Sequence, residues 1–320
     1  MQHFQIISKV EFDWTKHGLS SIFPFKDNLV ISFWYNYEEK YILKIAENDF
    51  EKIVIENCDI FNLPKSELRL VKLGNQFAII YKLRKLYFLD DDFQIKNVVE
   101  IQTEDNNRYS EFSTNFDIGI GENNEIPLIL CCGLDDYYTY YGYLYYDTYL
   151  QKAEIKKIFV FETNFFPKTN SDKLPFIKHL LLKDELLYGF IEGSQRTKYR
   201  GQNYSCLFKS NKDGTDGTKL FVEDYSIIQD DKRRGKVANF SYSKEYCIIS
   251  PLYEQKEYDS WRGKQKIYSI SDNELLEITL PKGYSKLKIF DHFNNIFWFK
   301  EFDKKKLVMS IYRAEKLRPT

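Results

Sequence analysis

The chain has little of what helices, phosphate loops or disulfide scaffolds require. Alanine, the best helix former, occurs only at Ala46, Ala78, Ala153, Ala238 and Ala314, which disfavours helix. The 14 glycines never form a G-x-G-x-x-G or Walker pattern, so no phosphate loop is expected. The five cysteines are an odd number without C-x-x-C spacing, which indicates buried thiols in a reduced compartment.

Charge and hydropathy argue against a nucleic-acid-binding, membrane-spanning or secreted protein. The 46 Lys and Arg residues nearly balance the 47 Asp and Glu residues, so the positive field of a nucleic-acid binder is missing. No apolar run reaches the length of a membrane span. Residues 1–12 show no charged region followed by an apolar one, so no secretory signal is expected. We therefore expect a cytoplasmic protein with neither a nucleic-acid nor a membrane partner.

The sequence also lacks catalytic and metal-binding motifs. Its four histidines, His3, His17, His179 and His292, are scattered without zinc spacing, and no G-x-S-x-G elbow occurs. Asp90-Asp91-Asp92 does not fit a calcium loop and is expected to shape a bend. We therefore expect no enzymatic activity, no cofactor and no metal. Two alternatives stay open: His179 facing a central channel, and Asp117 with Asn239 meeting there around an ion.

A repeated strand–turn–strand unit is the main positive feature. Its six copies are Leu19–Phe25 with Leu29–Tyr35, Leu68–Leu73 with Gln76–Leu83, Asn115–Gly121 with Ile126–Cys132, Phe176–Leu182 with Leu186–Glu192, Lys236–Tyr242 with Tyr246–Leu252, and Ser285–Phe290 with Ile296–Phe302. The second strand of each pair recurs after roughly 47 to 60 residues, the period of four-stranded propeller blades. Short polar turns join each pair, including Lys183-Asp184-Glu185 and a turn over 291–295.

A third and a fourth strand follow each pair, except that the last copy ends after its third. Gln5–Val10 has the same alternating pattern and would supply the missing outer strand. Such a pairing of the two termini removes an open sheet edge. The sequence therefore predicts an all-β fold in a single domain over 1–320. This fold would be a six-bladed β-propeller with four-stranded blades, closed by the N-terminal strand.

One blade carries a recognisable motif. Ser205–Val222, SCLFKSNKDGTDGTKLFV, resembles the third strand, Asp-Gly turn and fourth strand of TolB-like blades, and Lys266–Leu280 is a looser version of it. The resemblance implies the propeller fold and says little about function. Members of the TolB-like family are often periplasmic, in contrast to the cytoplasmic location expected here.

The long connections are expected to share one face of the propeller. They join second to third strands at Gly133–Tyr141, Gly193–Tyr204 and Tyr253–Gln265, and they also join successive blades. Long ordered loops are often functional. Tyr, Trp and Arg side chains, which dominate interface hot spots, gather there together with carboxylates. The predicted partner-binding residues are Asp135, Asp136, Tyr138, Tyr141, Arg196, Tyr199, Arg200, Arg233, Arg234, Tyr258, Trp261 and Arg262.

Three functions remain open. The first is a non-catalytic protein-binding propeller that is monomeric by itself. In its most specific form it is a bacterial, cytoplasmic immunity protein (antitoxin) that neutralises a secreted toxin domain through the long-loop face. The second is a propeller that binds a small ligand or glycan at the mouth of the channel, because aromatic rings beside carboxylates and amides suit sugars. The third is a hydrolase or lyase that uses a channel-side acid or His179.

Overall fold

The structure is a computed structural model, and every regular element in its described part is a β-strand. It describes residues 2–13, 19–26, 28–35, 39–55, 68–103, 116–131, 139–161, 176–196, 201–226, 234–253, 265–284, 287–303 and 305–317. Within these ranges, no helix is long and apolar enough to cross a membrane.

Two sheets contain four strands each, consecutive in sequence and paired antiparallel. The first has β2 (Leu19–Phe25), β3 (Asn28–Tyr35), β4 (Glu39–Ile45) and β5 (Phe50–Val54). The second has β14 (Phe176–Lys183), β15 (Leu186–Arg196), β16 (Gly201–Asn211) and β17 (Thr218–Ser226).

A third sheet has eight strands in two antiparallel halves. One half contains β6 (Leu68–Leu73), β7 (Gln76–Tyr81), β8 (Lys85–Leu89) and β9 (Ile95–Thr103). The other contains β10 (Phe116–Ile118), β11 (Glu125–Cys131), β12 (Thr139–Asp147) and β13 (Lys152–Phe159). The backbone pairing between the halves runs through the last strand of each, where β9 and β13 pair in parallel over three residues, from Ala153↔Ile101 to Ile155↔Thr103.

The fourth sheet repeats this arrangement. One half contains β18 (Arg234–Phe240), β19 (Tyr246–Tyr253), β20 (Lys266–Ser269) and β21 (Glu274–Thr279). The other contains β22 (Lys288–Phe293), β23 (Ile296–Asp303), β24 (Val308–Lys316) and the N-terminal strand β1 (Gln2–Asp13). Its halves touch where β1 and β21 pair in parallel.

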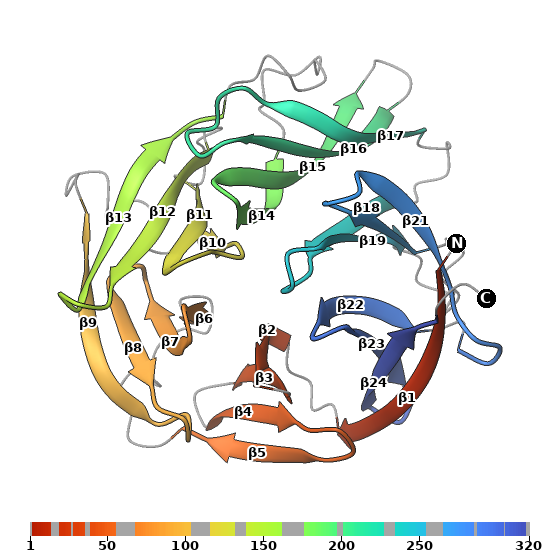
Figure 1. Cartoon of the computed structure of the whole chain (residues 1–320), viewed down its shortest axis with the longest axis horizontal. Helices are drawn as coiled ribbons and strands as arrows, with labels where there is room; N and C mark the ends of the chain where they lie inside the picture. Colours follow the sequence, from red (N-terminus) through yellow and green to blue (C-terminus); the bar gives the residue numbers. More distant parts are fainter. Residues whose placement is uncertain are drawn as a thin grey trace.

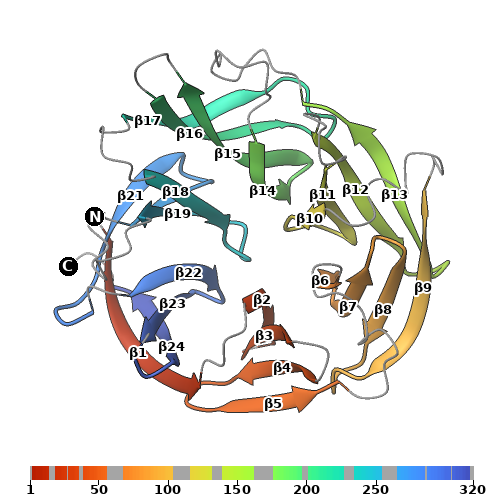
Figure 2. The ribbon, with the colours of Figure 1, turned by 180° about the vertical axis from the view of Figure 1, so that it is seen from behind.

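The two ends of the chain pair with each other. β1 runs antiparallel to β24 from Phe4↔Lys316 to Asp13↔Val308, with a register shift between Ile6 and Ser8. This is the pairing that the alternating pattern of Gln5–Val10 predicted. Figures 1 and 2 show β1 on the outside of the ring, where it covers the edge of β24. An uncovered edge would expose unpaired backbone N–H and C=O groups.

The sheets stand around a central axis, and hydrophobic clusters fill the space between neighbouring strand groups. Figure 1 shows β2, β6, β10, β14, β18 and β22 innermost. Ile129 and Tyr143 of one group pack with Leu187 and Phe208 of the next. Leu43 and Ile45 pack against Val10, Met309 and Ile311, which joins the beginning of the ring to its end. A closed ring of antiparallel sheets with cores between them is the β-propeller architecture.

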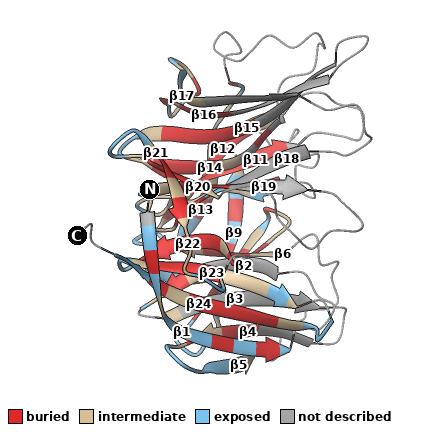
Figure 3. Cartoon of the chain, turned by 90° about the vertical axis from the view of Figure 1, so that its right-hand side faces the viewer, coloured by how far each residue is buried: buried red, intermediate tan, exposed pale blue. Residues whose placement is uncertain are grey.

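The strand ends define two faces of this ring. Tight turns lie at one end of the innermost strands, and Asp184, Glu185, Asn294 and Asn295 all have positive φ there, as two-residue hairpins require. The opposite ends of the strands lead into the long connections, as at the paired residues Cys131↔Thr139. Figure 3 shows the ring edge-on, with the strands running between the two faces. We call these the short-turn face and the long-loop face.

Two of the strand boundaries that differ from the sequence prediction lie at the centre of the ring. The expected strand Asn115–Gly121 is shorter, because the chain at Ile120 leaves β11 and bonds to β14: Ile120 N–H donates to Leu180 O (2.9 Å) and Leu182 N–H donates to Ile120 O (2.9 Å). A Cβ at Gly119 would collide with the carbonyl oxygen of Leu180, so glycine permits this crossing. The predicted turn over 291–295 was also wrong, because β22 continues to Phe293 and only Asn294 and Asn295 turn.

Candidate functional site

Most of the predicted partner-binding residues lie outside the described residues. These are Asp135, Asp136, Tyr138, Tyr199, Arg200, Arg233, Tyr258, Trp261 and Arg262. The backbone of two others is described. Arg196 is the last residue of β15 and pairs with Gly201, and Arg234 is the first residue of β18 and pairs with Tyr253. Both stand where their strands reach the long-loop face, and their role stays a prediction.

Tyr141 is a correction to the predicted surface. Its residue is 3% exposed, and its ring meets that of Phe161 edge-on at 4.5 Å between centroids. β12 begins at Thr139, three residues earlier than expected, and the strand alternation turns Tyr141 into the cluster that also contains Phe208. Tyr141 therefore stabilises the core and is not available to a partner.

The sheet of β14, β15, β16 and β17 reaches further towards the long-loop face than the sequence predicted. The expected loop Gly193–Tyr204 is mostly strand, because the β15–β16 pairing continues from Glu192↔Ser205 to Arg196↔Gly201. β17 accompanies this extension, with Ser226 opposite Gln202. Backbone pairing thus holds three strands beyond the point where the sequence suggested a free loop.

A cavity of about 300 Å³ lies at the centre of the ring. Its walls come from the innermost strands and the residues beside them: Phe23, Arg69, Leu70, Val71, Lys72, Asp117, Ile118, Gly119, Ile120, Gly121, Ile126, Asn239, Phe240, Tyr242, Phe290, Asp291 and Lys300. The structure therefore brings Asp117 and Asn239 into one cavity, as the sequence suggested. His179 is half-buried in β14 and is not among the described residues that line this cavity.

Charged groups of both signs line the central cavity. Burial raises the pKa of the Asp117 carboxyl, and the nearby Arg69 charge partly opposes this increase. Burial lowers the pKa of Lys72 and of Lys300. Both effects have one cause, because a site shielded from water disfavours the charged form of any group. The cavity is thus a polar chamber in which charge is poorly solvated.

Asp291 is the most deeply buried acid of this cavity, at 5% exposure. Its Oδ1 accepts hydrogen bonds from the backbone N–H groups of Tyr242 and His292, both at 2.7 Å. Burial nevertheless raises the pKa of Asp291 to about 7, because the two hydrogen bonds offset only part of the desolvation. The sequence pattern placed this residue in a turn, so it was not among the predicted functional residues. The apolar residues on both sides of it, in Lys288–Phe293, were the available signal of a strand.

A serine and a histidine meet beside Asp291, but not in a catalytic arrangement. Ser243 Oγ lies 2.8 Å from His292 Nδ1, and Glu245 Oε2 lies 3.2 Å from the same nitrogen. A hydrolytic triad uses both ring nitrogens, one for the serine and the other for the acid. Here hydroxyl and carboxylate share Nδ1, and the contact joins the turn after β18 to the end of β22.

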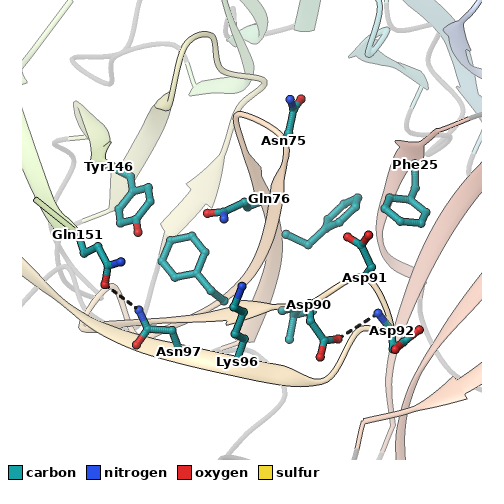
Figure 4. Close-up of a pocket in the computed structure, with 13 residues that line it drawn as sticks. Phe25, Asn75, Gln76, Asp90, Asp91, Asp92, Lys96, Asn97, Tyr146 and Gln151 are labelled. Carbon is teal, nitrogen blue, oxygen red and sulfur yellow. Dashed lines mark hydrogen bonds between the residues drawn. The ribbon is translucent and has the colours of Figure 1, made fainter. Parts of the chain in front are cut away.

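A second, larger hollow of about 500 Å³ opens on the short-turn face (Figure 4). Asn75, Gln76, Asp91, Lys96 and Tyr146 are among the side chains around it. Its acidic run shapes a turn, as predicted: Asp90 Oδ1 accepts the backbone N–H groups of Asp92 (3.0 Å) and Gln94 (2.8 Å). Across the described part of the chain, no three His, Cys, Asp or Glu side chains are grouped closely enough to hold a metal ion.

Comparisons with known proteins found similarity to solved structures at low sequence identity. No protein-family model matches the chain, and no curated protein matches its sequence. The chain is similar to BamB from Moraxella catarrhalis at 11% identity, over 97% of this chain and 99% of that chain, with a TM-score of 0.47. It is similar to the polysaccharide lyase Uly1 at 7% identity, over 95% and 91%, with a TM-score of 0.49. It is also similar to an α-L-arabinanase from Penicillium chrysogenum at 10% identity, over 91% of each chain, with a TM-score of 0.48.

The TolB-like resemblance of Ser205–Val222 stays a prediction, since no family model matches the chain. The strand–turn–strand geometry expected of that segment is confirmed, because β16 and β17 flank a turn in which Gly214 has a φ of +80°. Asp213 Oδ1 accepts the backbone N–H of Thr215 at 3.1 Å and so stabilises this turn.

Proposed function

We propose that the chain is a single propeller domain with six blades of four strands each, in which β22, β23, β24 and β1 form the last blade. The strand pairing supports this division. Within every group of four, neighbouring strands are antiparallel. The backbone pairing between the two halves of each eight-stranded sheet is a short parallel contact, β9–β13 in one sheet and β1–β21 in the other. Each eight-stranded sheet is then two blades that touch at their outer strands.

The propeller serves as a non-catalytic module that binds another protein through its long-loop face. The observation that carries this proposal is the extended edge formed by β15, β16 and β17. The β15–β16 pairing continues to Arg196↔Gly201, the residues that flank the segment 197–200 in the sequence, where Tyr199 and Arg200 are predicted anchors. A rigid strand pair presents side chains at low entropic cost, which favours a protein interface.

In its most specific form, the proposal is a cytoplasmic immunity protein that covers the active site of a bacterial toxin. Trp261 and Tyr258 would anchor the interface, and Arg196, Arg200 and Arg262 would supply charge complementarity to the partner. The lack of catalytic motifs in the sequence and the shared-nitrogen geometry of Ser243 and His292 support a role without catalysis.

The test compares two double variants on opposite faces. The tagged chain is purified from its native host, and the partner that co-purifies is identified and titrated against each variant. Trp261→Ala with Arg262→Ala is expected to weaken binding at least tenfold. The matched control is Tyr149→Ala with Lys152→Ala, at the β12–β13 turn of the short-turn face, where Tyr149 is 92% exposed.

Each result has a definite meaning. A toxin domain that binds stoichiometrically and is lost only in the Trp261 and Arg262 variant supports the immunity proposal. Loss in the Tyr149 and Lys152 variant instead would move the interface to the short-turn face. Recovery of the folded chain alone, from cells that express the toxin, would overturn the immunity proposal.

The small-ligand alternative is favoured by a separate observation, the polar central cavity.

A further inference from the structure

Two lysines of the central cavity lack an acidic partner. Lys72 of β6 and Lys300 of β23 both line it, and neither ammonium group lies within 4.0 Å of a carboxylate in the described part of the chain. Lys72 Nζ donates to the carbonyl oxygen of Pro24 (3.3 Å) and lies 5.6 Å from the centroid of the Tyr242 ring. Lys300 Nζ lies 5.4 Å from the centroid of the Phe290 ring.

The acids of the cavity are engaged elsewhere. Asp117 interacts electrostatically with Arg69, whose guanidinium also lies 5.8 Å from the Phe116 ring centroid. Asp291 accepts the backbone N–H groups of Tyr242 and His292, and its pKa of about 7 leaves it half protonated at neutral pH. Among the described residues that line the cavity, the basic side chains of Arg69, Lys72 and Lys300 therefore outnumber the two carboxyl groups.

Such an arrangement is unfavourable while the cavity holds only the protein's own groups. Lys72 and Lys300 are both half-buried, and an ammonium group that is partly withdrawn from water without an anion loses part of its solvation. Ring faces and a single carbonyl oxygen offset only part of this loss. A negatively charged molecule in the cavity would pair with both ammonium groups, where the low dielectric strengthens the attraction. Asn239 and Arg69 line the same cavity and add N–H donors, and an arginine grips an oxyanion through two parallel bonds.

We propose that the central cavity is a binding site for a small oxyanion, a phosphate or a carboxylate, held by Lys72 and Lys300 with Arg69 and Asn239 beside them. The volume of about 300 Å³ is at the lower end of the range for small-molecule pockets. The ligand is therefore a compact metabolite-sized anion. This site lies among the innermost strands and does not depend on the protein partner proposed for the long-loop face.

The test measures binding of inorganic phosphate and of citrate by calorimetry, with sodium chloride at matched ionic strength as the salt control. The site variant is Lys72→Met with Lys300→Met, which keeps an unbranched side chain one atom shorter at each position and removes both charges. The control is Lys26→Met with Lys96→Met, which removes two charges near the short-turn hollow. We expect one of the two anions to bind the wild-type chain. Its affinity for the site variant should be at least tenfold weaker, and its affinity for the control should be within twofold of wild type.

Tighter binding of phosphate assigns the phosphate class, and tighter binding of citrate assigns the carboxylate class. Equal affinity in the site variant and the wild type, or no binding of either anion to the wild type, overturns the proposal. A second measurement needs no variant: the ¹³Cε shifts of the wild-type lysines are followed against pH. The bound anion must raise the pKa of two lysines that titrate below the others, and unchanged titration curves would also overturn the proposal.

Discussion

Asp291 Oδ1 accepts the backbone N–H of Tyr242 at 2.7 Å, which ties the innermost strand β22 to the turn that follows β18. The bond crosses from one strand group to the next at the wall of the central cavity. Ser243 and His292 make a second contact between the same two segments. Two neighbouring strand groups are thus joined by polar groups at the wall of the central cavity.

The buried Asp291 carboxyl should make folding sensitive to pH. Its folded pKa of about 7 is above the value of an unfolded aspartate, about 4. Its contribution to stability is therefore complete below about pH 4 and is lost as pH rises towards 7. Asp291→Asn keeps an acceptor oxygen for Tyr242 and cannot ionise. We expect the variant to gain about 2–4 kcal/mol over the wild type between pH 4 and pH 8, measured by chemical denaturation. If the unfolding free energies of the two proteins changed with pH in parallel, the raised pKa of Asp291 would be contradicted.

His292 should act with the opposite sign. Burial of its ring, with the Lys316 charge nearby, lowers its pKa to about 4. Glu245 lies 3.2 Å away but is half-exposed, so water screens its charge. The contribution of His292 is complete above about pH 6.5 and is lost as pH falls towards 4.

His292→Phe keeps a ring against Tyr246 and Phe297 and removes the titration. We expect the variant to lose less stability than the wild type between pH 6.5 and pH 4, by about 1–3 kcal/mol in unfolding free energy. The double variant with Asp291→Asn should show neither slope. If His292→Phe loses as much unfolding free energy as the wild type between pH 6.5 and pH 4, other groups cause that loss.

Closure of the ring should depend on the buried face of β1. Phe4 is 3% exposed and meets Phe297 and Phe299 edge-on, at 4.9 and 5.5 Å between centroids. Phe4→Ala is expected to cost about 3–5 kcal/mol, because it leaves a cavity between β1 and the last strands. Ile7, 38% exposed on the same strand, is the control, and Ile7→Ala should cost well under half as much. Guanidinium unfolding measures both, and equal losses would show that β1 contributes through backbone pairing alone.

The sequence predicted most strands because their alternation and turn residues are local properties. Gln5–Val10 could be assigned to the last blade from its pattern and from the missing fourth strand, and it pairs there with β24. The acidic run Asp90-Asp91-Asp92 was correctly interpreted as a turn, since its hydrogen bonds are to its own backbone.

The errors occurred where contacts with another blade decide the local structure. β10 is short because Ile120 bonds to Leu180 of β14, 60 residues away, which no local pattern indicates. Tyr141 resembled an interface residue by type, and its burial depends on Phe161 and Phe208. Asp291 resembled a turn residue, and its place in β22 depends on backbone donors, one of them from the neighbouring blade.

The sequence by itself determined the all-β class, the repeated strand groups and the pairing of the two termini, because periodicity and turn chemistry act over a few residues. Only the tertiary structure decided which polar groups meet. Arg69, Lys72, Asp117, Asn239, Asp291 and Lys300 come from several strand groups and share one cavity because the ring closes around it. The altered pKa values of the two acids and the two lysines among them follow from that enclosure, since loss of water around a charge is a property of the assembled fold.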